Sequence, residues 1–284
     1  MSLEISDLTI RFGERVVVDA VSFSVAPGER FGIIGESGSG KSLTTLAIPG
    51  LLPERATWTG SVRLDGVELL GLAEKELARI RGRRIGSVFQ DPQTALNPMR
   101  TIGNQLVEPL LLHGIVGRRD HDERARQAVR LASLVKLPDP SRIVERYPHQ
   151  LSGGQRQRVG IGIALAASPS VLLADEPTTA LDVTIQAGIL ELFNDLVSES
   201  GTALVFVTHD LGVLAQVADS VLVLANGRAV ERGTVAGILD HPQHEVTAGL
   251  VAAARLTSFD ARIPLGGGDP ADRRAEPAAE GGLS

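Results

Sequence analysis

The N-terminal segment alternates apolar and polar residues with the period of two that β-strands require. The apolar positions are Leu3, Ile5, Leu8 and Ile10, then residues 16–18, then Val21, Phe23 and Val25. Because alternate side chains of a strand point to opposite faces, this pattern predicts strands with one buried face. Residues 60–70 predict a β-hairpin that turns at Asp65-Gly66.

From residue 30 onward, short apolar runs alternate with segments of helical character. Arg30–Ile34 predicts a buried strand, a glycine-rich loop follows over Gly35–Gly40, and Lys41–Pro49 predicts a helix. Further strands are predicted at residues 85–89, 171–174, 203–207, 221–224 and 228–232, and further helices at 73–81, 156–167 and 183–199. This alternation predicts an α/β core with a mostly parallel sheet.

Two other regions differ from this core. Residues 100–148 have a helical and more polar pattern, with charged residues dense between 118 and 130, which predicts a separate helical lobe. Residues 264–284 are rich in Pro, Gly, Ala and charged residues, without periodicity. Such a composition buries too little apolar surface to fold, so this last part of the chain is predicted to be disordered.

Composition narrows the class of protein further. The 284 residues carry a net charge of −6, which argues against nucleic acid as the main partner, and contain no cysteine, which excludes disulfides and Cys-ligated metal centres. The N-terminus lacks the basic and apolar regions of a signal peptide, and no apolar run approaches the roughly 18 residues of a spanning helix. The chain is therefore expected to be soluble by itself and to reach a membrane only through partners.

The glycine-rich loop carries the most specific chemistry. It reads Gly35-Glu36-Ser37-Gly38-Ser39-Gly40-Lys41-Ser42. This matches the P-loop pattern in full. The glycines let backbone N–H groups surround a phosphate, Lys41 can reach the β- and γ-phosphates, and Ser42 can ligate Mg²⁺. A purely structural turn is the alternative, but the strand before the loop and the helix after it favour a nucleotide site.

A second candidate element is the apolar strand that ends in two adjacent carboxylates, Asp175 and Glu176. Ligands of open α/β sheets bind at the carboxyl ends of the strands, so these acids are expected near the P-loop. Asp175 would hold Mg²⁺, directly or through water, and Glu176 would orient and polarise the attacking water. A solvated acidic turn is the alternative, which the neighbouring P-loop disfavours. The two elements together predict a P-loop NTPase.

The segment Leu151-Ser152-Gly153-Gly154-Gln155 indicates the kind of NTPase. Here the sequence resembles the ATP-binding-cassette (ABC) family, whose signature is this pentapeptide. Ser152 and the amides of Gly153 and Gly154, at a helix N-terminus, can form a second anion site. The resemblance implies that this site binds the γ-phosphate of an ATP held by another subunit. Ser152 would also serve as an ordinary helix N-cap, and the two roles are compatible.

Four further positions align with functional residues of the family. The resemblance implies that Gln90 contacts Mg²⁺ and links the nucleotide state to the transport partner, and that Asp182 lies in a loop crossing the dimer interface. It also implies that His209 touches the γ-phosphate and that Phe12 stacks on adenine. Taken alone, these residues would be interpreted as a polar loop residue, a helix N-cap, a structural histidine and a core aromatic residue.

Longer segments resemble one branch of the family, the ATPase subunits of dipeptide, oligopeptide and nickel importers. These segments are Gln90–Pro98, Tyr147–Arg158, Ala180–Gln186 and His241–His244. Two features differ from that branch. Glu245-Val246-Thr247 stands where many members have Pro-Tyr-Thr, and the Cys-containing C-terminal extension of many peptide members is absent. The solute is therefore open between peptides, nickel and a related compound.

The resemblance implies an α/β fold with a P-loop NTPase (RecA-like) core, an antiparallel β subdomain and an inserted α-helical subdomain at about residues 93–155. The nucleotide-binding domain would span residues 1–250, and residues 251–284 would form a C-terminal tail. Two ATPase subunits, identical or paralogous, would sandwich ATP and Mg²⁺ head to tail. They would act with two membrane permeases and, indirectly, an extracytoplasmic solute-binding protein, at the cytoplasmic face of the cell membrane.

Two alternatives remain beside this importer hypothesis. A soluble ABC ATPase outside transport is disfavoured because the chain has one cassette, and because the roughly 110 residues between P-loop and signature show no sustained heptads. A non-catalytic subunit with a degenerate site is disfavoured because Lys41, Ser42 and Glu176 are all present.

Overall fold

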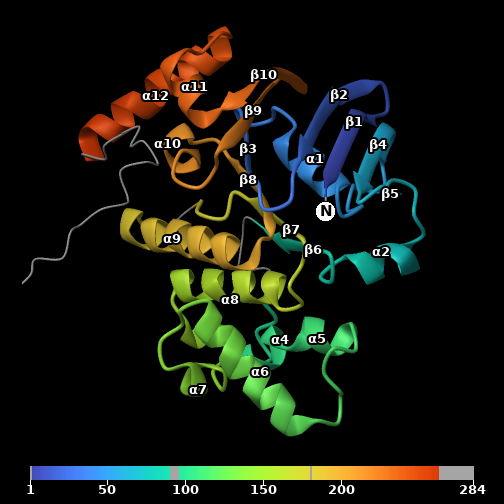
Figure 1. The fold of residues 1–284 in the computed structure, drawn as a ribbon, viewed down its shortest axis with the longest axis vertical. Coiled ribbons are helices and arrows are strands. Elements are labelled where there is room, and N and C mark those ends of the chain that lie inside the picture. Colours follow the sequence, from blue (N-terminus) through green and yellow to red (C-terminus); the bar gives the residue numbers. More distant parts are fainter. Residues whose placement is uncertain (1, 90–95, 180, 262–284) are drawn as a thin grey trace, which may run out of the picture.

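Two β-sheets, the helices packed against them and a separate lobe of helices make up the structure (Figure 1). The computed structural model describes residues 2–89, 96–179 and 181–261, and the side chains as far as residue 256. The predicted α/β class is confirmed, since a mostly parallel sheet alternates with helices along the chain.

The smaller sheet is antiparallel, with the strand order β2–β1–β4–β5. Its strands are β1 (Leu3–Phe12), β2 (Arg15–Val25), β4 (Ala56–Leu64) and β5 (Val67–Glu68). The predicted apolar positions of β1 are all buried, although Ile5 and Leu8 are three residues apart rather than two. The pairing register shifts between them, and Asp7 adopts a left-handed conformation with φ of 49°. This β-bulge absorbs the extra residue, so both apolar pairs reach the same face.

The larger sheet has the strand order β10–β9–β3–β8–β7–β6. Its strands are β3 (Arg30–Ile34), β6 (Ile85–Val88), β7 (Val171–Asp175), β8 (Ala203–Thr208), β9 (Ser220–Ala225) and β10 (Arg228–Thr234). The strands from β9 to β6 are parallel, and β10 pairs antiparallel with β9. Both faces of β8 are buried, since Leu204 and Phe206 belong to one hydrophobic core and Val205 and Val207 to the other. A parallel strand covered on both faces reads as a continuous apolar run, as this one does.

Helices surround the larger sheet and form the lobe. The helices outside the lobe are α1 (Lys41–Ala47), α2 (Glu74–Ile80), α8 (Gly153–Leu165), α9 (Val183–Ser200), α10 (Leu211–Leu214), α11 (Val235–Asp240) and α12 (Glu245–Ala261). The lobe contains α4 (Ile102–Leu106), α5 (Glu108–Leu112), α6 (His121–Leu134) and α7 (Pro140–Ile143), and the 3₁₀ helix η1 (Pro148–Gln150) follows it. In Figure 1 the lobe lies below α8 and α9, at the opposite end from α11 and α12.

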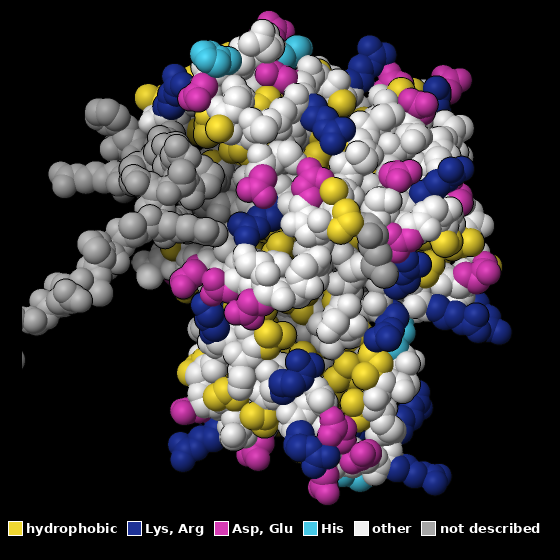
Figure 2. Space-filling model, in the orientation of Figure 1, with side chains coloured by type: hydrophobic (Ala, Val, Ile, Leu, Met, Phe, Trp, Pro, Cys, Tyr) yellow, Lys and Arg dark blue, Asp and Glu magenta, His cyan; other side chains and the backbone are white. Residues whose placement is uncertain are grey.

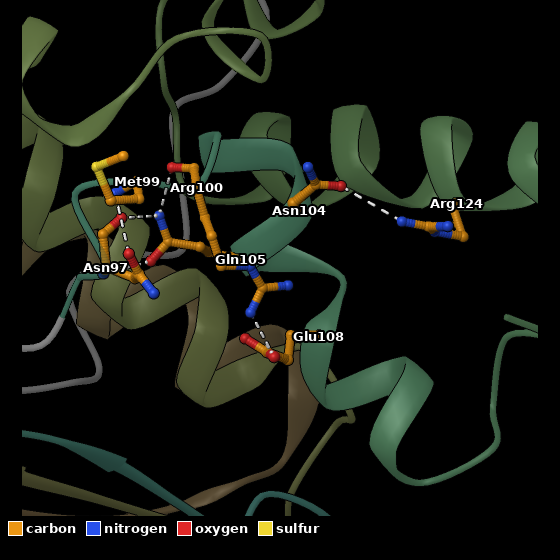
Figure 3. Close-up of polar contacts among 7 residues, drawn as sticks. All are labelled: Asn97, Met99, Arg100, Asn104, Gln105, Glu108 and Arg124. Atoms are coloured by element: carbon orange, nitrogen blue, oxygen red, sulfur yellow. Dashed lines mark hydrogen bonds and ion pairs between the residues drawn. The ribbon is translucent and has the colours of Figure 1, made fainter.

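Polar side chains hold the chain where it enters the lobe (Figure 3). The amide of Gln105 accepts from the backbone N–H of Asn97 at 2.8 Å and donates to the carbonyl oxygens of Asn97 and Arg100 at 3.1 and 2.9 Å. Gln105 is buried, so these bonds satisfy its polar atoms and fix the turn before α4. Arg100 also pairs with Glu108 at 2.5 Å, which ties this turn to α5.

The C-terminal helix α12 runs through residue 250, where the predicted nucleotide-binding domain ends. Val251 and Ala254 lie beyond that boundary and are buried in the larger hydrophobic core. The helix therefore packs with the core to at least residue 254, and the described chain continues to residue 261.

Candidate nucleotide-binding site

The candidate residues gather at the carboxyl edge of the larger sheet because neighbouring parallel strands end there. β3 leads into the glycine-rich loop, β7 ends at Asp175, and β8, which lies between β3 and β7, leads to His209. The register aligns these ends, with Ile34 opposite Thr208 and Asp175 opposite Val207. Strand order, rather than proximity in sequence, therefore assembles the site.

The glycine-rich loop folds back around the side chain of Lys41. The Lys41 ammonium donates to the carbonyl oxygens of Gly35 at 2.8 Å and Glu36 at 2.9 Å, and the side chain is only 5% exposed. A Cβ on Gly35 would lie 2.1 Å from the carbonyl oxygen of Leu224, so no larger residue fits there. Burial lowers the pKa of Lys41, while the carboxylates of Glu176 and Asp175 act in the opposite direction. The loop thus positions a cation beside two acids.

A cavity of about 620 Å³ opens above this loop. Its lining consists of Val17, Glu36, Ser37, Gly38, Gly40, Lys41, Ser42, Leu43, Glu176, His209 and Leu250. This volume lies within the range typical of small-molecule and cofactor sites. The cavity brings together the P-loop, the second carboxylate and the histidine that were predicted separately.

Phe12, the predicted adenine-stacking residue, is not in the lining of this cavity. Its side chain is half-buried and packs against the smaller hydrophobic core. Val17 of β2 and Leu250 of α12 provide apolar walls instead. The sequence carried no signal for either, because both read as ordinary apolar positions of a strand or a helix.

Asp175 and Ser42 have the chemistry of a magnesium site. The Oδ1 atom of Asp175 is buried and has no hydrogen-bond partner among the residues that the structure describes. Burial raises the pKa of Asp175, and a hydrogen bond from the Ser42 side chain opposes that rise. No cluster of three or more potential ligands from His, Cys, Asp and Glu occurs in the described part of the chain. A cation here would take few protein oxygens and the rest from phosphate and water, as Mg²⁺ does.

Glu176 is held in a defined orientation next to His209. The residue has φ of 46°, a left-handed conformation that costs energy for a non-glycine residue. Its Oε2 accepts from the Thr179 hydroxyl at 2.9 Å and lies 3.4 Å from Nδ1 of His209. The Glu176 side chain is 16% exposed and that of His209 58%. This geometry suits a carboxylate that orients a water molecule and a histidine that can reach a phosphate.

The signature segment lies outside the lining of this cavity. The Ser152 hydroxyl accepts from the backbone N–H of Gln155 at 3.3 Å, and the Gln155 side chain accepts from the N–H of Ser152 at 3.0 Å. This reciprocal capping box begins α8, so Ser152 is an N-cap. Ser152 and Gly153 are exposed, whereas Gly154 is buried. A second protein chain can therefore reach the serine.

Of the two remaining predicted site residues, Asp182 and Gln90, the structure describes only Asp182. The Asp182 carboxylate accepts from the N–H of Ile185 at 2.9 Å and caps α9, while its side chain stays exposed. Gln90 lies outside the described residues, so its predicted role stays a prediction. Ala180 also lies outside them.

These features define a P-loop ATPase whose signature helix begins at an exposed N-cap. The chain belongs to the ABC transporter family, whose sequence model matches residues 18–179. It is 47% identical over 257 residues to the oligopeptide transport ATP-binding protein OppD of Bacillus subtilis, covering 88% of this chain and 71% of that protein. It is 43% identical over 273 residues to OppD of Salmonella typhimurium, covering 94% of this chain and 81% of that protein.

Solved structures agree with this assignment. The ATP-binding cassette MJ0796, in a dimeric post-hydrolysis state bound to ADP and Pi, superposes with a TM-score of 0.72. It is 32% identical in sequence, and the alignment covers 82% of this chain and 98% of that one. The predicted family and the predicted RecA-like fold class are thereby confirmed. In the described residues, no helix has the length and apolarity needed to cross a membrane.

Proposed function

We propose that this chain is the ATP-hydrolysing subunit of an ABC importer and that it couples ATP binding and hydrolysis to the uptake of peptides. The observation that carries the proposal is the single cavity in which Lys41, Ser42, Glu176 and His209 meet. This cavity combines a phosphate cradle with a carboxylate that can orient water. Relatives that are 43–47% identical over most of the chain are named oligopeptide transport proteins, which favours peptides over nickel.

In the proposed mechanism two ATPase subunits pair head to tail. One chain holds the phosphates with the loop Gly35–Ser42. Asp175 and Ser42 would hold Mg²⁺, which would neutralise phosphate charge when bound. The partner presents Ser152 and the following amides to the γ-phosphate. The exposure of Ser152 and its absence from the cavity lining of its own chain support this arrangement. Loss of the γ-phosphate then removes a bridge between the subunits and favours opening.

The helical lobe is the part of the chain proposed to contact the permeases. Met99 is 83% exposed and Leu112 68%, and Figure 2 shows apolar side chains among charged ones over the lobe. A hollow of about 450 Å³ is lined by residues of α4, α6 and α7. In this hollow Arg124 donates to the side chain of Asn104 at 3.3 Å and to the carbonyl oxygen of Arg118 at 3.4 Å (Figure 3). Contacts between the lobe and the permeases would place the chain at the cytoplasmic face of the membrane.

The proposed function is tested by reconstitution of the chain with its permeases and solute-binding protein in lipid vesicles. ATP hydrolysis is expected to rise when the binding protein is loaded with an oligopeptide, and not when Ni²⁺ is supplied. Glu176→Gln is expected to lower kcat by about 10²-fold or more while ATP still binds, because it removes the carboxylate that orients water.

The contrary outcomes are distinct. Stimulation of ATP hydrolysis by Ni²⁺ alone would overturn the proposal that the solute is a peptide. Failure to assemble with polytopic membrane proteins would favour a soluble ABC ATPase. A Glu176→Gln variant with undiminished kcat would remove the proposed role of that carboxylate.

A further inference from the structure

The N-terminal halves of α8 and α9 meet through two glycines. A Cβ on Gly154 of α8 would lie 2.6 Å from Cγ2 of Ile185 in α9. A Cβ on Gly188 of α9 would lie 3.1 Å from a guanidinium nitrogen of Arg158 in α8. Glycine lowers the stability of a helix relative to alanine, and a side chain at Gly154 would have to displace Ile185, so the close approach of α8 and α9 requires glycine at that position.

Arg158 links three elements at this place. Its guanidinium donates to the carbonyl oxygen of Gly188 in α9 at 3.1 Å and to that of Val135, at the C-terminal end of α6, also at 3.1 Å. The side chain is half-buried, and burial lowers the pKa of Arg158, with Glu191 acting in the opposite direction. The planar fork of a guanidinium can reach two separate acceptors in a fixed geometry, which an ammonium cannot reproduce.

The two contacts fix the relative orientation of the helices. Gly154 and Arg158 are four residues apart, so the contacts lie about 6 Å apart along the axis of α8. Ser152 precedes the first contact by two residues, and the Asp182 carboxylate accepts directly from the N–H of Ile185. A tilt of α8 on α9 would have to break one of the contacts, so the two N-caps move together.

We propose that Arg158 is a positioning residue for ATP hydrolysis, because it locks α8 to α9 and presents Ser152 and Asp182 to the partner subunit as one rigid unit. The inference rests on the proposed function, in which both N-caps face another chain. Arg158 itself does not line the nucleotide cavity and is not a catalytic residue.

The chain offers a matched control. Lys136, next to Val135, also reaches α9, with Nζ 2.5 Å from Asp195 and 3.6 Å from Glu191. This pair is largely solvent-exposed, and exposed pairs hold geometry weakly. Lys136→Met therefore removes a cation between the same elements without removing the lock.

The test combines kinetics with a distance measurement in the full chain. Because the chain has no cysteine, Gly160→Cys in α8 and Ala187→Cys in α9 give a unique pair of spin-label sites. Arg158→Met is expected to widen the distance distribution between the labels. In the unlabelled protein Arg158→Met is expected to lower kcat at least tenfold. The ATP Kd of the isolated chain is expected to stay within twofold of that of the unsubstituted chain. Arg158→Lys is expected to restore part of kcat, and Lys136→Met to change neither measurement.

The outcomes separate the inference from the proposed function. The label distances report the lock in the isolated chain, whether or not the assembled protein hydrolyses ATP. A narrow distribution in Arg158→Met, or a widened one with unchanged kcat, would overturn the inference. If Arg158→Met does not fold, the same distance and kcat measurements are made on Arg158→Lys, which keeps the charge and loses the planar fork. A distance distribution and a kcat equal to those of the unsubstituted chain would then overturn the inference.

Discussion

The two segments of this chain that we propose bind phosphate differ in how far one molecule completes them. Lys41 is buried, its ammonium is hydrogen-bonded to two loop carbonyls, and it shares a cavity with Glu176 and His209. Ser152 is exposed, and the hydrogen bonds described for its side chain and N–H stay within its own capping box. The first segment lines a cavity within a single chain, whereas in the proposed mechanism the second forms a site only opposite another molecule.

Different interactions build the two segments. The P-loop site depends on the order of β3, β8 and β7, which brings residues more than 100 positions apart to one edge. The signature depends on local capping of α8 and on the packing of that helix against α9. A change in one segment is therefore expected to leave the other intact, and substitutions can test this independence.

The largest effect is expected from Ser152→Arg, which should abolish turnover while the ATP Kd of the same chain stays unchanged. The added side chain would project from an exposed N-cap into the space that the proposed mechanism gives to the partner's phosphate. Loss of the cap alone costs about 1 kcal/mol, so unfolding must be measured alongside the steady-state kinetics.

Asp120→Ala is the matched control for the lost cap. Asp120 caps α6 in the lobe by accepting from the N–H of Glu123 at 3.0 Å, and it lies outside the nucleotide cavity. The Asp120→Ala substitution should lower the stability of the chain by about as much as the loss of the Ser152 cap does, and should leave ATP turnover intact. Simultaneous loss of ATP binding and turnover in Ser152→Arg would indicate misfolding, and would contradict a site that acts on another chain.

An effect of intermediate size is expected from Lys41→Ala, which should weaken ATP binding by about tenfold or more, roughly 1.4 kcal/mol. The ammonium beside the cradle would no longer neutralise phosphate charge. Equilibrium titration with a fluorescent ATP analogue measures the Kd. Lys75→Ala is the control, because Lys75 is exposed on α2 and far in sequence from the loop. An unchanged Kd in Lys41→Ala would remove the P-loop from the binding site.

The sequence predicted those parts of the fold that local pattern determines. Strand β3 was predicted with its observed limits, because an apolar run between Pro27-Gly28 and Gly35 leaves little choice. The bulge at Asp7 was not predicted, since only a spacing of three between apolar residues marks it. Helix α12 was not predicted either, because Thr247 and Gly249 weaken its helical pattern, and packing against the core stabilises it instead.

The same limit applies to the site. The positions of Lys41, Asp175, Glu176 and His209 follow from motifs at strand ends, and the structure brings them to one edge. Val17 and Leu250, which are more than 200 residues apart, line the cavity because of tertiary packing alone. Phe12 lies outside that lining for the same reason, since the fold of the smaller sheet directs it toward the core.

The smallest effect is expected from the ion pair between the lobe and α9. Lys136→Met should lower the stability of the chain only slightly, because exposed pairs gain little in water. Lys136 also has φ of 53°, a left-handed conformation that methionine tolerates no better than lysine, so backbone strain is unchanged by the substitution. Urea unfolding at low and high salt measures the difference, which should shrink as salt screens the charges. A loss of stability as large as that of Arg158→Met would show that the lobe is held to α9 by this pair, and not mainly by Arg158 and the apolar contacts around it.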